Sequence, residues 1–272
     1  MPDFLQADWG AMKAISGKTL KQIFYAININ KSKELLLEGM TPDLLGEYFC
    51  LNHLEKSKLD NDEADFLQHF RNEAWRRNPQ EFFSFLDRIA DDYPDHRVVK
   101  MLFEQPLPLQ AETVLYYAIF LFSLTYRDCI ERSIWAKDRL EALYAEYPEI
   151  VLEYAKGLFN LSNAYSEIAD KKTCIDKLEE LAEECASTPE IVLVYAQGLV
   201  NLSHDYSEIA DKKTCIDKLE ELAEEYASTP EIVLVYAQGL FNLSHAYSEI
   251  ADKKTCIDKL EELFAEHPEW DF

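Results

Sequence analysis

A block of 41 residues occurs three times in succession, and this repeat limits the possible folds more than any other feature of the chain. The copies run over residues 149–189, 190–230 and 231–268. A period of 20 to 50 residues is typical of solenoids, in which each unit buries its apolar face only by stacking on its neighbours. The sequence therefore predicts a stacked array instead of one closed core.

Each copy contains the pattern of two helices. Thr188, Pro189 and Glu190 place a capping hydroxyl, a proline and an acid in the order that favours a helix start. Apolar residues at helical spacing then predict a first helix up to about Glu167 and a second from about Asp170 to Ala186. The residues predicted to form the core include Leu161, Leu202 and Leu243, Tyr165, Tyr206 and Tyr247, and Cys174, Cys215 and Cys256.

The spacing of these residues resembles a known family. Leu158, Leu161, Ser162 and Tyr165, followed by Ala169 and by Cys174, Ile175, Leu178 and Leu181, are similar to the tetratricopeptide motif. The resemblance implies an all-α fold, an α-α superhelix of antiparallel helix pairs. The period of 41 is longer than the family's 34, which we interpret as a longer first helix, and Ser162 replaces the usual glycine.

Earlier parts of the chain carry weaker copies. Residues 112–148 form a shorter one, in which Leu121, Leu124 and Thr125 correspond to Leu158, Leu161 and Ser162. We expect repeats over residues 109–272, a degenerate helix pair with a short extra helix over 61–108, and an irregular helical segment over 1–60. Within 61–108, the short helix is expected at 96–103 and a turn at 105–108.

Residues 42–49, PDLLGEYF, resemble a stretch that precedes tetratricopeptide arrays in signalling NTPases of the STAND class. This resemblance implies that the chain is the sensor part of a larger switch. No phosphate-binding GxxxxGK[ST] motif occurs in the sequence, so nucleotide binding by that route is not expected.

The net charge of −24 limits the classes of partner. Phosphate would be repelled, which disfavours nucleic acid and acidic membranes and favours a basic or neutral protein partner. The start of the chain lacks the pattern of a secretory signal, and the longest apolar run, 114–124, is too short to span a bilayer. We expect a cytoplasmic protein.

No catalytic, cofactor or metal site is predicted. The six histidines are scattered, and none is spaced with cysteine or aspartate as a nucleophile pair requires. The cysteines of the repeats occupy one position seen three times, which indicates small core residues and not a ligand set. An enzyme is the less favoured alternative.

The first two copies differ at six positions, and five of these fall on one side of the first helix: Glu153/Val194, Lys156/Gln197, Phe159/Val200, Asn163/His204 and Ala164/Asp205. Two interpretations are open, drift on a solvated face or contact with a partner. Charged residues of the second helix, among them Lys177 and Glu179, recur unchanged although we expect them to be exposed. This contrast favours the contact interpretation.

The tetratricopeptide resemblance implies a peptide-binding groove lined by the first helices. Carried over position by position, its residues are Lys156, Phe159, Asn160, Asn163 and Glu167, then Gln197, Val200, Asn201, His204 and Glu208, then Gln238, Phe241, Asn242, His245 and Glu249. The cationic positions that would clamp an acidic C-terminal tail are not matched. A structural role in self-assembly is the alternative.

The end of the sequence resembles the start of a further copy. Pro268 and Glu269 repeat Pro230 and Glu231, while Leu263, Phe264 and Trp270 add apolar groups. Repeat arrays normally end in a unit with a polar outer face. We therefore expect that this end pairs with a second chain, giving a homodimer, or continues in a longer protein.

Overall fold

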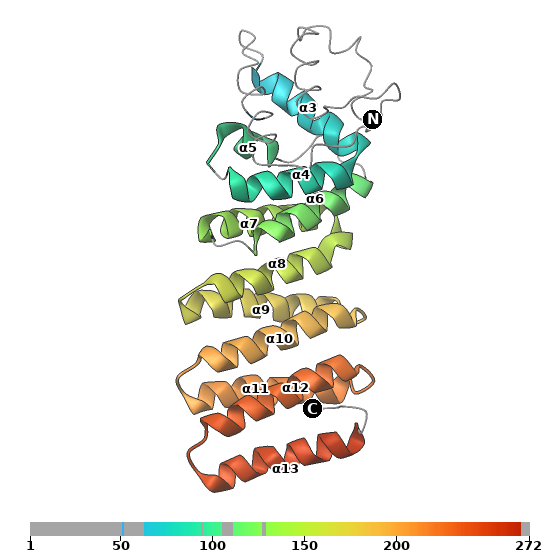
Figure 1. Cartoon of the computed structure of the whole chain (residues 1–272). Coiled ribbons are helices and arrows are strands. Elements are labelled where there is room, and N and C mark those ends of the chain that lie inside the picture. The colour runs from blue at the N-terminus through green and yellow to red at the C-terminus, as the bar shows by residue number, and fades with distance from the viewer. Residues whose placement is uncertain (1–50, 52–62, 94, 105–110, 127–128, 268–272) are drawn as a thin grey trace, which may run out of the picture. The chain divides into compact units, whose positions relative to one another are not determined.

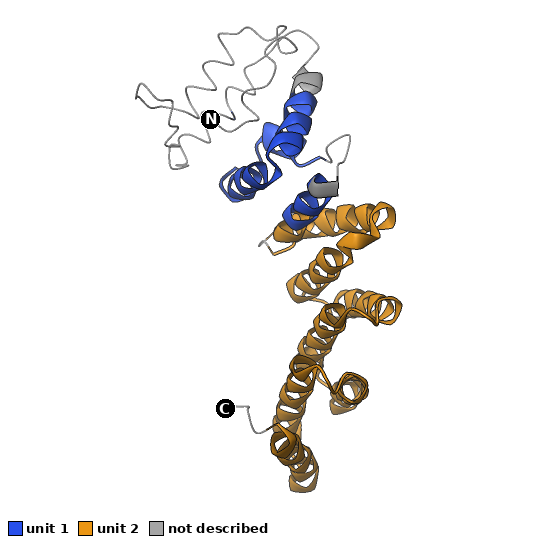
Figure 2. Ribbon diagram, turned by 90° about the vertical axis from the view of Figure 1, so that its right-hand side faces the viewer, with its two compact units in different colours: residues 1–120 blue, residues 121–272 orange. Residues whose placement is uncertain are grey.

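The structure is a computed structural model that describes residues 51, 63–93, 95–104, 111–126 and 129–267. Every regular element in these ranges is a helix, and the chain divides into two compact units, 1–120 and 121–272 (Figure 2). The all-α fold class is thus confirmed. The segment 1–50 with its STAND-like stretch, the turn at 105–108 and the chain after His267 lie outside the described residues.

The first unit contains α3 (Glu63–Arg77), α4 (Pro79–Asp92) and α5 (Arg97–Leu102), and α6 (Ala111–Leu124) begins in it. Asn78 separates α3 from α4: its side chain accepts a hydrogen bond from the Glu81 backbone N–H, and proline follows as the first helical residue. Trp75 forms the centre of the core. Its fully buried ring makes edge contacts with Phe82 and Tyr117 at centroid distances of 5.2 and 5.7 Å.

The second unit contains the repeats. Its elements are α7 (Ile130–Glu146), the 3₁₀ turn η2 (Pro148–Ile150), α8 (Val151–Ala164), α9 (Ile168–Glu184), α10 (Pro189–Asp205), α11 (Ile209–Glu225), α12 (Pro230–Ala246) and α13 (Ile250–Glu266). Consecutive helices pack as hairpins (Figure 1). The first helices α8, α10 and α12 contact one another in succession, while α9 and α11 each also pack on the first helix of the next pair. The predicted superhelix of helix pairs is confirmed.

The first helices end about one turn earlier than predicted. Tyr165, Tyr206 and Tyr247 are the residues at which α8, α10 and α12 end, each with extended backbone. All three tyrosines, just beyond the helix ends, are half-buried. The prediction that they are core residues was therefore wrong, whereas Leu161, Leu202 and Leu243 are buried, as are the three repeat cysteines.

A small hydroxyl residue closes each first helix. The Oγ of Ser162, Ser203 and Ser244 donates to the carbonyl three residues earlier at 2.7 Å, and Thr125 makes the same bond to Phe122. All four side chains are buried. This shared geometry supports the correspondence of Thr125 with Ser162.

Glycines set the closest approach between successive units. A Cβ atom at Gly198 would lie 2.5 Å from Ile175 Cδ1, and one at Gly239 would lie 2.8 Å from Ile216 Cδ1. Real Cβ atoms are essentially never found this close to a neighbour, so a larger residue in place of either glycine would require the facing isoleucine side chain to shift.

Candidate functional site

The predicted groove residues lie on α8, α10 and α12 and on the loops that follow them. The exposed members from the helices are Asn163, Gln197, His204, Gln238, Phe241 and His245, and the half-buried ones are Lys156, Phe159, Asn201 and Asn242. We call these ten residues the first-helix face. Since the three helices contact one another in succession, the structure brings residues from different repeats onto neighbouring helices.

Two predicted residues do not belong to this face. Asn160 is 8% exposed, and its Nδ2 donates to Thr125 Oγ1 at 3.1 Å. Val200 is 5% exposed and lies against α12, where a Cβ on Gly239 would meet its Cγ2 at 3.8 Å. Both side chains are used in packing between units, so they are not available to a ligand.

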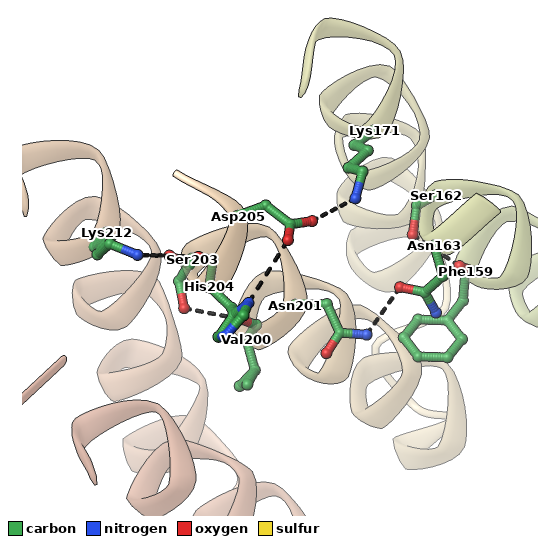
Figure 3. Close-up of polar contacts among 10 residues, drawn as sticks. All are labelled: Phe159, Ser162, Asn163, Lys171, Val200, Asn201, Ser203, His204, Asp205 and Lys212. Carbon is green, nitrogen blue, oxygen red and sulfur yellow. Dashed lines mark hydrogen bonds and ion pairs between the residues drawn. The ribbon is translucent and has the colours of Figure 1, made fainter. Parts of the chain in front are cut away.

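An amide pair links α8 to α10 on the first-helix face. Asn201 Nδ2 donates to Asn163 Oδ1 at 2.9 Å (Figure 3). Each side-chain amide has two donor hydrogens and one carbonyl acceptor. Among the described residues, this bond leaves the NH₂ group of Asn163 and the carbonyl of Asn201 for a ligand.

A polar network lies at the end of α10, beside this pair. Lys171 of α9 forms an ion pair with Asp205, and His204 Nδ1 lies 3.6 Å from the same carboxylate (Figure 3). Burial raises the pKa of Asp205, but the hydrogen bond and charge of Lys171 outweigh this effect, so the net pKa is lowered. Lys212 donates to the Ser203 and His204 carbonyls at 2.9 and 3.0 Å, which caps α10.

An aromatic group lies on α12. The Phe241 side chain is 54% exposed, and its ring centroid is 4.4 Å from that of His245. Since a carbonyl oxygen can only accept, His245 Nδ1 donates to the Phe241 carbonyl at 2.9 Å. This bond holds the imidazole next to the exposed phenyl ring.

Three predicted glutamates lie in loops between the helices of a pair. Glu167, Glu208 and Glu249 are exposed and directly precede α9, α11 and α13. Their backbone carbonyls accept from the N–H groups of Lys171, Lys212 and Lys253, whereas their side chains make no capping bond. The carboxylates therefore add negative charge at the ends of the first-helix face.

Structural contacts account for part of the variation between copies. Val194 and Val200 are buried, and Asp205 occurs only in the middle copy, where it pairs with Lys171. The recurring charges of the second helices also have a structural reason, because Glu179 pairs with Lys218 and Glu220 with Lys259 across successive units. The contrast between variable and unchanged positions thus does not by itself identify a binding surface.

Other kinds of site find little support in the described ranges. No three His, Cys, Asp or Glu side chains gather there as a metal site would require. None of the helices described combines the length and apolar character needed to cross a bilayer. Burial raises the pKa of Cys174 and of Cys215 to about 11, which disfavours the nucleophilic thiolate.

Comparisons with known proteins add no functional information. No protein-family model matches the chain, and no curated protein does. A solved structure described as "Computational Design of Self-Assembling Cyclic Protein Homooligomers" is similar over 99% of this chain and 96% of its own, with 8% sequence identity and a TM-score of 0.23. A likeness at this TM-score carries no argument about fold or function.

Proposed function

We propose that the protein is a non-catalytic interaction module that binds a protein or peptide segment on its first-helix face. The observation that carries the proposal is a set of exposed amide, imidazole and phenyl groups on three helices that contact one another in succession. Asn163, His204 and Phe241 are each exposed and come from three successive repeats. The packing of the repeats on one another does not explain why these amide, imidazole and phenyl groups are exposed to solvent.

The chemistry of the face fits an extended segment or a helix with apolar and polar side chains. Amide groups such as those of Asn163 and Asn201 can hydrogen-bond a peptide backbone, and an exposed aromatic ring such as Phe241 is a typical anchor for an apolar side chain. Peptide recognition commonly combines these two elements. Side chains of the bound segment that contact the Phe241 ring would then determine which sequences bind.

Charge indicates which partners the face disfavours. Lys171 is engaged by Asp205, and Lys212 by the end of α10. Glu167, Glu208 and Glu249 are exposed beside the face, and the whole chain carries −24. A basic or neutral segment is therefore the proposed partner, because an acidic one would be repelled.

A peptide-display selection on the purified chain tests the proposal. Selected peptides should be basic or neutral and contain a large apolar residue, and Phe241→Ala should weaken their binding by about 1–2 kcal/mol. The double variant Asn201→Ala with His204→Ala should weaken it as well. The matched control is Leu115→Ala, which removes a side chain that is 46% exposed in the other unit.

Folding and binding must be separated in this test. The melting temperature of Phe241→Ala should stay near that of the parent chain because the ring is exposed. Peptides that bind all variants equally would place the site elsewhere. A selection that enriches acidic peptides would contradict the proposed charge preference.

A further inference from the structure

The second unit has a row of exposed side chains that includes a residue at the end of α6. A buried hydroxyl residue closes each of α6, α8, α10 and α12, and the residue that follows it is exposed in all four cases. These four residues, which we call the exposed row, are Tyr126, Asn163, His204 and His245. Tyr126 is 80% exposed and was not among the groove residues predicted from the sequence.

Contacts within the second unit place the members of the exposed row on successive helices. α8 contacts α10, and α10 contacts α12. α8 also meets the end of α6, because Asn160 Nδ2 donates to Thr125 Oγ1 at 3.1 Å and a Cβ on Gly157 would lie 3.6 Å from Thr125 Cγ2. The row therefore runs from α6 to α12 in chain order.

Exposed aromatic groups lie at the two ends of this row. Tyr126 is at the end next to α6, and at the other end Phe241 is 54% exposed beside His245. Between them, the residues equivalent to Phe241 are more covered: Phe159 is half-buried and Val200 is 5% exposed. The surface thus offers two separate anchors for large apolar side chains.

The middle of the row favours an extended segment over a helix. The bond from Asn201 Nδ2 to Asn163 Oδ1 leaves the NH₂ group of Asn163 and the carbonyl of Asn201 for a ligand, among the described residues. An extended segment has backbone N–H and C=O groups that can bond to these amides, whereas a helix uses its own within the helix.

The distance between the two anchors sets the length of the bound segment. Neighbouring packed helices lie about 8–10 Å apart, so the three steps from α6 to α12 span about 24–30 Å. An extended chain advances about 3.3 Å per residue and covers this distance in about seven to nine residues. An α-helix, which rises about 1.5 Å per residue, would need about 16–20.

Charge selects the residues between the anchors. Glu167, Glu208 and Glu249 are exposed and each follows a member of the exposed row by four residues. The nearby cation Lys171 is already paired with Asp205. Lysine or arginine side chains between the two apolar residues would therefore be attracted to these carboxylates.

We propose that the exposed row binds an extended basic segment that carries two large apolar side chains about eight residues apart, one placed at Tyr126 and the other at Phe241. This inference rests on the proposed function of the first-helix face. It adds Tyr126 to the binding surface and gives the bound segment a conformation and a spacing.

The synthetic peptide FKSKSKSKF, with its two phenylalanines eight residues apart, is the probe. Fluorescence anisotropy of the labelled peptide with the full chain should show saturable binding. FKSKFSKSK has the same composition but a spacing of four, and it should bind at least about tenfold more weakly because it cannot reach both anchors at once. FESESESEF should not bind, because its carboxylates are repelled.

Variants of the chain test the anchor at α6. Tyr126→Ala should weaken the binding of FKSKSKSKF about tenfold and leave the melting temperature unchanged, since the ring is exposed. Leu115→Ala is the matched control: Leu115 is 46% exposed, lies about three turns before Tyr126, and should have no effect. Peptides from the display selection should likewise carry two large apolar residues about seven to nine positions apart.

The outcomes separate this inference from the proposed function. Equal affinities for FKSKSKSKF and FKSKFSKSK, or an unchanged affinity in Tyr126→Ala, would overturn the two-anchor inference. The proposed function would stand if Phe241→Ala still weakens binding, and both proposals fail if neither variant does. A dissociation constant above about 1 mM for FKSKSKSKF would also overturn the inference, and the display selection then tests the proposed function on its own.

Discussion

At the scale of single residues, the spacing between repeats depends on side chains that are small or absent. Gly198 is the tightest case, since a Cβ there would lie 2.5 Å from Ile175 Cδ1. Ser203 in the same helix is buried and satisfies its hydroxyl within the last turn, so it occupies little space and leaves no unpaired donor. Gly198 thus allows α10 to lie close against α9, and Ser203 is buried in the last turn of α10 at little cost.

Gly198→Val should therefore destabilise the protein by about 1–3 kcal/mol, because the added atoms overpack the contact with α9. The free energy of unfolding from urea denaturation measures this effect. Gln197→Val is the matched control: it puts the same residue at an exposed position of the same helix and should change stability by less than about 0.5 kcal/mol. Equal effects of the two variants would rule out the close contact.

Leu202 provides a test of the core. Its side chain is 5% exposed, so Leu202→Ala should cost about 2–5 kcal/mol through lost burial and the cavity that remains. Leu115→Ala, at a side chain that is 46% exposed, should cost much less. Thermal unfolding of both variants gives the comparison, and an unchanged melting temperature for Leu202→Ala would disprove the packing described here.

At the scale of helices, the copies are not interchangeable although their sequences are nearly the same. Asp205 pairs with Lys171 of the preceding helix, but the other two copies carry Ala164 and Ala246 at this position. Lys212, which is equivalent to Lys171, instead caps the end of α10. A single aspartate thus joins α9 to α10 by a contact that the following junction lacks.

This ion pair predicts a dependence of stability on pH. The pKa of Asp205 is lowered in the folded chain, so the pair stabilises the fold above the ordinary value of 3.8 and loses this effect as pH falls through the lower folded pKa. The difference in unfolding free energy between the parent chain and Asp205→Asn should be constant from about pH 7 to 5 and shrink below 3.8.

The matching control for this series is Glu224→Gln, which neutralises an exposed carboxylate in α11. Chemical denaturation at each pH provides the data for both variants. A difference for Asp205→Asn that does not shrink at low pH would show that the ion pair with Lys171 is not its source. Asp205→Ala, which copies the other repeats, should behave like Asp205→Asn.

At the scale of the whole molecule, stability in a stacked array depends on the number of neighbours that each unit has. α9 and α11 each pack on helices of two pairs, whereas α13 packs on α12 among the described helices. Linear arrays open most readily at the element with fewest contacts. The three copies provide matched probes, because Cys174, Cys215 and Cys256 lie in the same local sequence.

Cys256 should therefore react with a thiol reagent faster than Cys174 and Cys215, although all three are buried to a similar extent. Burial raises the pKa of each thiol, so reaction at neutral pH requires local opening as well as ionisation. Labelling over time followed by peptide mass spectrometry measures the three rates. Equal rates would show that the array opens as one cooperative unit.

The sequence alone determined the all-α class and the stacking of helix pairs. A repeat with apolar residues at helical spacing can bury them only against the next repeat, and this holds without coordinates. Leu161 and Cys174 were placed correctly in the core for that reason. The order of the repeats along the chain was enough to predict how they stack, because each unit contacts mainly the units next to it in the sequence.

Only the tertiary structure decided which of the predicted groove residues are exposed to solvent and which are buried. Asn160 and Asn201 occupy equivalent positions in the sequence, yet one is buried against Thr125 and the other bonds Asn163 on the first-helix face. Val200 is covered by α12, whereas Phe241 at the same position is exposed. Exposure depends on the helix that lies across each position, and in a repeat this neighbour changes from copy to copy while the local sequence stays the same.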